Sequence, residues 1–330
     1  MTPRGRPRLP DTGRGYADAV PSRPLSSTAP VELARAVAST LRGRDLAAVA
    51  AGLTYFAGLG VVPWLLLAVW GASVISSPEQ VAVWLADLRL LVPPEMGARP
   101  VFDALVRAGL ELGPWGALVT ILPATFYGEG LRRASLRLSP RRDRFTGWRA
   151  RLSLLPLVLA VPFLALGVFA TAPLLAHLAR IGGFAGTLGQ VVVAFHVSFV
   201  AIGVVVTWGF RVVAPGGPAW VPVLLGAFGT SAVLSGFLQG FLLFLALPID
   251  LGIPFGGLDI VGAIVAIALW MFVLHVLLLL GWAATEALDR RRRGHRDGVP
   301  VADEAPGPQG TPDTPDGPPP AAAVTVGAGR

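Results

Sequence analysis

Two sets of polar side chains in this chain have residue types and spacing that suit chemistry. The first set is charged: Asp45 precedes a long apolar run, and Glu129 stands three and four residues before Arg132 and Arg133. Glu129 and Arg133 therefore share one helical face. Guanidinium groups bind phosphate well when carboxylates hold them in place. We predict that Asp45, Glu129, Arg132 and Arg133 form either a headgroup-binding cluster or a salt-bridge network that fixes two helices.

The second set is uncharged at neutral pH and lies deep inside apolar segments. It comprises His196, Gln239 and His275. Polar groups at membrane depth are costly and usually face a partner or water. A lone histidine there donates to a neighbouring carbonyl more often than it carries protons. Two interpretations stay open: separate structural roles, or an intramembrane polar path in which His196 and His275 meet because their helices pack.

The histidines do not have the spacing of a metal site. His177, His196, His275 and His295 are isolated from one another, without a His-x-His or His-Glu-x-x-His pattern. A metal-dependent nuclease needs several ligands converging on one or two ions. The chain also has no cysteine, which excludes thiolate ligands and nucleophiles. We therefore predict no catalytic residues, no metal, no cofactor and no enzymatic activity.

The elements that carry these side chains are suited to a lipid bilayer. Hydrophobic residues make up 53% of the chain and charged residues 14%, against about 25% charged in soluble domains. Six segments are long and apolar enough to cross about 30 Å of hydrocarbon. We predict an all-α polytopic membrane protein whose spans cover about residues 46–70, 114–131, 152–176, 184–210, 219–247 and 257–285.

The segments outside the spans divide into two kinds. Apolar residues recur at helical spacing over residues 78–91 and 101–110, which predicts two amphipathic helices in the first outer loop. These helices either cap the bundle or form a substrate lid. Residues 1–30 are rich in Pro, Arg and Ser, and residues 290–330 are basic at first and then rich in Pro, Gly and Ala. This predicts a disordered arm and a disordered tail around a transmembrane domain at 31–289.

Arginines gather on alternate connections between the predicted spans. The N-terminal arm, the loop of residues 132–151 and the run of residues 290–293 hold most of them. The positive-inside rule then places both termini in the cytoplasm of a cell, or inner, membrane. Because aromatic residues do not interleave these arginines, we expect anionic lipid headgroups as partners and no nucleic acid. Tryptophans at the ends of spans, Trp282 among them, predict an aromatic belt.

Three stretches resemble a known family. The first span opens with RDLAAVAAGLTYF (residues 44–56), followed by Pro63, which is similar to the first-span motif of the YihY/BrkB membrane proteins. The sequence YGEGLRRA (residues 127–134) resembles the end of their second span. The last span resembles theirs from Phe255 to Gly281, with Phe255, Gly257 and Trp282 departing from the usual residues. Glu286 then replaces the family's acid only in part.

The resemblance covers roughly residues 34–289 and implies a six-helix inner-membrane fold. Members of the family were formerly mislabelled ribonuclease BN, and roles in envelope lipid export and serum resistance have been proposed for some. We therefore expect this protein to transport or translocate a lipid or other amphiphile. The alternative is a non-catalytic envelope scaffold. A ribonuclease comes third, because the isolated histidines do not favour it.

Overall fold

A computed structural model describes residues 29–92, 98–139, 148–245 and 252–296. Within these ranges the chain is helical without β-strands, which confirms the all-α prediction. The predicted disordered arm and most of the predicted tail lie outside the described residues. Residues 1–291 form one compact unit, which holds every site described below, and residues 292–330 form a second.

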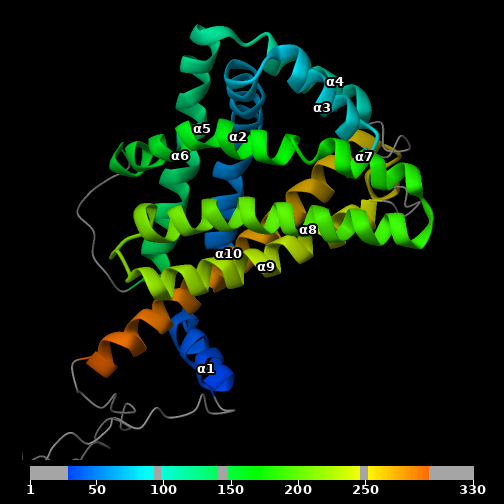
Figure 1. The fold of residues 1–330 in the computed structure, drawn as a ribbon. Helices are drawn as coiled ribbons and strands as arrows, with labels where there is room; N and C mark the ends of the chain where they lie inside the picture. Colours follow the sequence, from blue (N-terminus) through cyan, green and yellow to red (C-terminus); the bar gives the residue numbers. More distant parts are fainter. Residues whose placement is uncertain (1–28, 93–97, 140–147, 246–251, 297–330) are drawn as a thin grey trace, which may run out of the picture. The chain divides into compact units, whose positions relative to one another are not determined.

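The helices follow one another without sheet elements between them (Figure 1). Their bounds are α1 Ala29–Leu41, α2 Leu46–Ile75, α3 Pro78–Arg89, α4 Ala98–Leu110, α5 Gly113–Leu138, α6 Trp148–Phe169, α7 Ala172–Ile181, α8 Gly183–Trp208, α9 Trp220–Leu245 and α10 Asp259–Arg296. A π-helical turn, Gly209–Val213, continues α8, and a short 3₁₀ turn, Ile253–Phe255, precedes α10.

Helix α2 begins at a side-chain cap. The carboxylate of Asp45 accepts a hydrogen bond from the backbone N–H of Ala48 at 2.9 Å, which satisfies one of the free donors of the first turn. The helix then runs 30 residues to Ile75, a length of about 45 Å. It packs against α3, α4, α5 and α6 and runs beside α5 in Figure 1.

Glycines allow the closest helix contacts around α2. A Cβ atom on Gly130 of α5 would lie 2.7 Å from the side chain of Phe56, and one on Gly71 of α2 would collide with Pro162 of α6. Lipid tails are as apolar as leucine, so helices in a bilayer associate by van der Waals packing more than by the hydrophobic effect. Small residues at these points therefore set how closely α2 approaches α5 and α6.

Helices α9 and α10 meet through a reciprocal pattern of glycine and threonine. A Cβ on Gly226 of α9 would collide with Thr285 of α10, and one on Gly281 of α10 would collide with Thr230 of α9. Each threonine hydroxyl donates to the carbonyl of the glycine four residues earlier, at 2.6 Å for Thr230 and 2.8 Å for Thr285. The hydroxyls are thus satisfied within their own helices, while the side chains fill the space above the opposite glycines.

Five described helical stretches are long and apolar enough to cross a membrane by themselves: Leu46–Ile75, Arg151–Ile181, Gly183–Val213, Trp220–Phe244 and Asp259–Gly294. Helix α5 passes the same test only together with α4, from which it is bent by 116°. Helix α5 alone is only moderately apolar, because Gly, Pro and Thr are interspersed among its hydrophobic residues and Glu129 and three arginines lie in its second half. The described part of the chain therefore contains five helices that are long and apolar enough to span a membrane, or six if α4 and α5 form one bent span.

Several predicted spans end before the helices that contain them, the first at 70 against Ile75 and the second at 131 against Leu138. The third, predicted over residues 152–176, is built from α6 and α7, which meet at residues 170–171 and continue to Ile181. The sixth, predicted to end at 285, belongs to a helix that continues through the arginine run to Arg296. The start of the predicted tail is therefore helical.

The two amphipathic helices expected in the first loop are present as α3 and α4. Ser77 caps α3 by accepting from the N–H of Gln80 at 3.1 Å. Arg89 of α3 donates from Nε to Asp103 of α4 at 2.6 Å, which joins the two helices. Their apolar faces pack against α2, with Val81 and Leu85 buried among them.

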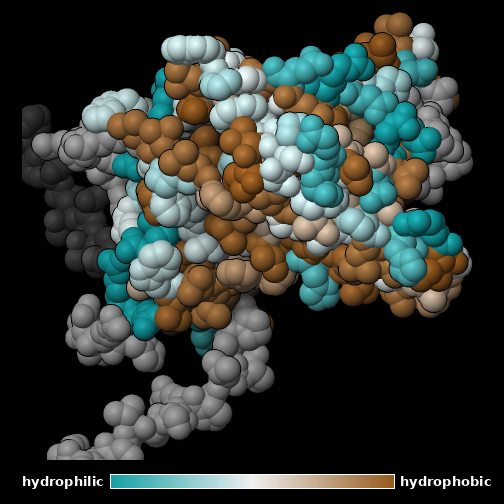
Figure 2. Space-filling view, turned by 45° about the horizontal axis from the view of Figure 1, so that its top comes forward, coloured by the Kyte–Doolittle hydropathy of each residue, from teal (hydrophilic) through white to brown (hydrophobic). Residues whose placement is uncertain are grey.

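The surface of the helices is largely apolar, as Figure 2 shows by the brown side chains that cover much of the visible face. Large hydrophobic residues are strongly exposed, with exposed fractions of 65% for Val74, 81% for Trp115 and 84% for Phe184. A protein in water rarely exposes contiguous apolar surface of this extent. The surface is suited to contact with lipid chains.

The contact between α9 and α10 is sensitive to glycine replacement. We expect Gly226→Leu to lower the thermal unfolding temperature in detergent, with an unfolding free energy reduced by about 1–3 kcal/mol, because the new side chain overpacks against Thr285. Gly229→Leu on the same helix is the matched control, since nothing lies within 4 Å of its Cβ position. Equal unfolding temperatures for the two variants would contradict the packing described here.

Candidate functional site

A cavity of about 620 Å³ lies among the spans. Helices α2, α5, α6, α8, α9 and α10 contribute to its wall, and so do α3 and α4 through Leu88 and Phe102. Its size is in the usual range for ligand pockets, about 300–1,000 Å³. The amphipathic helices of the first loop therefore form part of the cavity wall as well as covering helix ends.

The wall of this cavity is almost entirely apolar. None of the described residues that line it is charged, and apart from methionine sulfur only Trp64, Tyr127 and His275 bring polar side-chain atoms. The indole N–H of Trp64 is engaged, because it donates to the carbonyl of Ala124 at 3.0 Å. The polar character of the cavity is thus concentrated at Tyr127 and His275.

His275 is buried on α10, between α2 and α5. Its Nδ1 lies 2.6 Å from the carbonyl oxygen of Met271 and 3.1 Å from the hydroxyl of Thr54. Its Nε2 lies 3.4 Å from the hydroxyl of Tyr127. A carbonyl oxygen only accepts, so Nδ1 carries the hydrogen and Nε2 of the neutral ring presents a lone pair. The cavity therefore contains a neutral hydrogen-bond acceptor beside a phenol.

The other two residues of the predicted polar path lie elsewhere. His196 is exposed on α8, where its Nδ1 is 2.8 Å from the carbonyl of Val192. Gln239 is half-buried on α9 beside Leu238, but only Leu238 lines the cavity. Among the hydrogen bonds of the described residues, none joins His196, Gln239 and His275 to one another. Of the three, only His275 lines the cavity.

The charged cluster forms around Glu129, with a different set of partners from the expected one. Glu129 is buried on α5 and pairs with Arg133 one turn later. Arg151 of α6 donates to the other carboxylate oxygen, from Nε at 2.7 Å and from Nη2 at 2.5 Å. The guanidinium of Arg151 also lies over the ring of Phe126, 4.4 Å from its centroid. One carboxylate is thus shared by two arginines from two helices.

The remaining members of the predicted cluster are used in other contacts. Asp45 caps α2, and Arg132 donates from Nη1 to the carbonyl of Val213 at 3.0 Å. The structure thus brings Glu129 and Arg133 together, adds Arg151, and gives Asp45 and Arg132 separate roles. Arg151 is the last arginine of the predicted loop of residues 132–151 and directly precedes the third predicted span. The pairing itself depends on the contact between α5 and α6.

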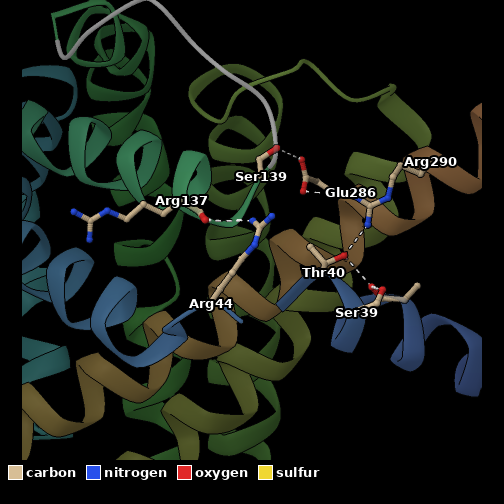
Figure 3. A network of polar contacts seen from close by, with 8 residues as sticks. Ser39, Thr40, Arg44, Arg137, Ser139, Glu286 and Arg290 are labelled. Carbon is tan, nitrogen blue, oxygen red and sulfur yellow. Dashed lines mark hydrogen bonds and ion pairs between the residues drawn. The ribbon is translucent and has the colours of Figure 1, made fainter. Parts of the chain in front are cut away.

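A second polar network, which the sequence interpretation did not include, lies near the end of α10 (Figure 3). Glu286 is 2% exposed and accepts from the hydroxyl of Ser139 at 2.9 Å. One turn later, Arg290 donates to the hydroxyl of Thr40 at 2.8 Å. Asp289, also buried, accepts from the backbone N–H of Ala219 at 2.9 Å. The network connects α10 with α1, with α5 and with the start of α9.

Within the part of the chain that the structure describes, no group of three or more His, Asp or Glu side chains is arranged to hold a metal ion. The carboxylates at Glu129 and Glu286 face arginines and a serine instead. Both clusters connect helices through charge-assisted hydrogen bonds.

The comparison with known protein families adds to this geometry. A family model described as virulence factor BrkB matches residues 37–306. The chain belongs to the BrkB family. No curated protein and no solved structure matches it. The match covers α2 to α10, and so includes every helix that lines the cavity of this BrkB-family protein. Together with its apolar helices, it identifies a multi-pass membrane protein and confirms the resemblance to YihY/BrkB.

The ion pairs of Glu129 differ in exposure, which leads to a prediction for this BrkB-family protein. We expect Glu129→Gln to reduce the unfolding free energy by about 1.5–3 kcal/mol, because the half-buried Arg151 loses its charged acceptor. Arg133→Gln, at a side chain that is 63% exposed, should change it by less than about 1 kcal/mol. Thermal unfolding of both variants in detergent measures the difference. A larger effect for Arg133→Gln would refute this ranking.

Proposed function

We propose that this protein holds the apolar chain of an amphiphile in its cavity and translocates that amphiphile in the membrane. The observation that carries the proposal is a cavity of about 620 Å³ whose wall is apolar and free of charged side chains among the described residues. Atoms that line an empty apolar space lack partners for dispersion contacts. A lipid chain supplies those contacts, whereas an ion or a sugar would lose its hydration without replacement.

The helices around the cavity supply features that favour translocation over a scaffold role. Helix α6 contains Pro156 and Pro162 and lines the cavity through Val161 and Ala165. Proline removes a backbone hydrogen bond and kinks a helix, so α6 deforms more readily than a regular helix. Helices α3 and α4 close part of the cavity from outside the spans. Movement of α6, α3 or α4 lets the apolar chain of an amphiphile enter and leave the cavity.

We also propose a cell-membrane location with both termini in the cytoplasm and anionic lipid headgroups beside Arg133. Two arginines share the carboxylate of Glu129, so this cluster has one positive charge in excess. Arginine near a membrane surface attracts anionic headgroups. The arginine-rich loop between α5 and α6 supports the same orientation through the positive-inside rule.

A variant that fills the cavity tests the main proposal. Val205 of α8 lines the cavity, so we expect Val205→Trp to displace most of the lipid that native mass spectrometry detects on gently extracted protein. Val200→Trp is the matched control on the same helix, because Val200 is 53% exposed and lies outside the cavity. The scaffold alternative is supported, and transport refuted, if wild type and both variants carry no lipid or equal amounts.

Single-cysteine labelling tests the orientation, and the natural chain has no cysteine that interferes. We expect a membrane-impermeant maleimide to label Glu111→Cys in intact cells and to label Arg137→Cys only after permeabilisation. Glu111 lies just before α5 and Arg137 in its last turn, and both are exposed. Labelling of both positions from outside would show that α5 does not cross and that the arginine loop is external.

A further inference from the structure

The polar end of the ligand is indicated by the pair of side chains at the wall of the cavity. Nδ1 of His275 is held by Met271 and Thr54, which leaves Nε2 as an acceptor directed towards Tyr127. The separation of 3.4 Å between Nε2 and the phenol oxygen exceeds the ordinary range of hydrogen bonds to such groups, about 2.7–3.2 Å. Each of the two groups is therefore weakly satisfied by the other.

A ligand hydroxyl is suited to both groups at once. It donates its hydrogen to Nε2 of His275 and accepts the hydrogen of the Tyr127 phenol. A carboxylate or a phosphodiester has no hydrogen for Nε2, and an ammonium group has no lone pair for the phenol. Each of these ions would also lie in an apolar cavity with no charged side chain among its described lining residues, which costs several kcal/mol for an unpaired ion.

The charged residues closest in sequence do not change this conclusion. Glu129 follows Tyr127 by two residues on α5, but its two carboxylate oxygens are occupied by Arg133 and Arg151. None of these three side chains lines the cavity. A charged headgroup inside the cavity thus has no counter-ion among the described residues that line it.

We infer that the cavity takes an amphiphile whose polar end is a single uncharged hydroxyl on a long apolar chain. This inference rests on the proposed function and specifies the class of substrate. The hydroxyl binds between His275 and Tyr127, and the chain occupies the apolar remainder of the cavity, which is lined by residues such as Leu88, Phe102 and Val205.

Three probes of equal chain length separate the hydroxyl from the chain: 1-hexadecanol, hexadecane and hexadecanesulfonate, which is charged at every accessible pH. Retention of each labelled probe is measured on the full-length protein in detergent. We expect hexadecanol to be retained at least about tenfold more than the sulfonate, because the charged head is not compensated in the cavity. Hexadecane should be retained less than the alcohol and more than the sulfonate.

Two pairs of matched variants assign the effect to the polar pair. Tyr127→Phe and His275→Leu should each lower hexadecanol retention roughly threefold to tenfold, the effect of one neutral hydrogen bond, and leave hexadecane retention unchanged. The controls are Tyr55→Phe, at a side chain 65% exposed, and His196→Leu, at an exposed histidine with the same Nδ1 contact to the carbonyl four residues earlier. Both should bind the alcohol as wild type does.

The outcomes distinguish this inference from the proposed function. Equal retention of all three probes, or unchanged hexadecanol binding in Tyr127→Phe, overturns the hydroxyl site while the cavity remains a chain-binding site. Absence of any probe from wild type, or binding that Val205→Trp leaves unchanged, overturns both. If His275→Leu does not fold, Tyr127→Phe still decides, since it removes a single oxygen atom.

Discussion

In the interior of a bilayer, no water is present to satisfy polar groups, so each must find its partner inside the protein. Four hydroxyls of the spans satisfy this constraint within their own helices. Thr54, Thr230, Ser231 and Thr285 each donate to the carbonyl four residues earlier in their own helix, at 2.6–2.9 Å. These hydroxyl hydrogens are therefore not available to link helices, and contact between helices depends largely on shape, as at Gly226 and Gly281. Where shapes do not fill the space, an apolar cavity remains.

Hydropathy predicted the fold class and most spans, because a long apolar run favours a membrane-spanning helix however the helices pack against one another. It failed where tertiary contacts decide. Trp282, predicted in the aromatic belt, is instead completely buried, 5.4 Å from the ring of Phe210, because α10 packs against the end of α8. The continuation of α10 past residue 285 was also missed, because the partners of Glu286 and Asp289 come from other helices.

The candidate site was predictable only where both partners lie on one helix. Glu129 and Arg133 are four residues apart, so their pairing follows from helix geometry. Arg151 reaches the same carboxylate from α6, a contact that no spacing in the sequence encodes. Asp45 lies directly before a helix, where aspartate often caps the first turn, but the sequence pattern placed it in the charged cluster. His196 and His275 look alike in the sequence, and only the orientation of their helices separates an exposed histidine from one in the cavity wall.

Helix α5 explains how a charged cluster and a neutral binding pair exist so near each other. Tyr127 and Glu129 differ by about 3 Å along the helix axis but by about 200° around it. The face of Tyr127 lines the cavity, and the face of Glu129 meets α6 and its arginine. The carboxylate is paired on its own face, and none of the described residues that line the cavity is charged. The proposed headgroup contact at Arg133 and the inferred hydroxyl site at Tyr127 therefore lie on different faces of α5.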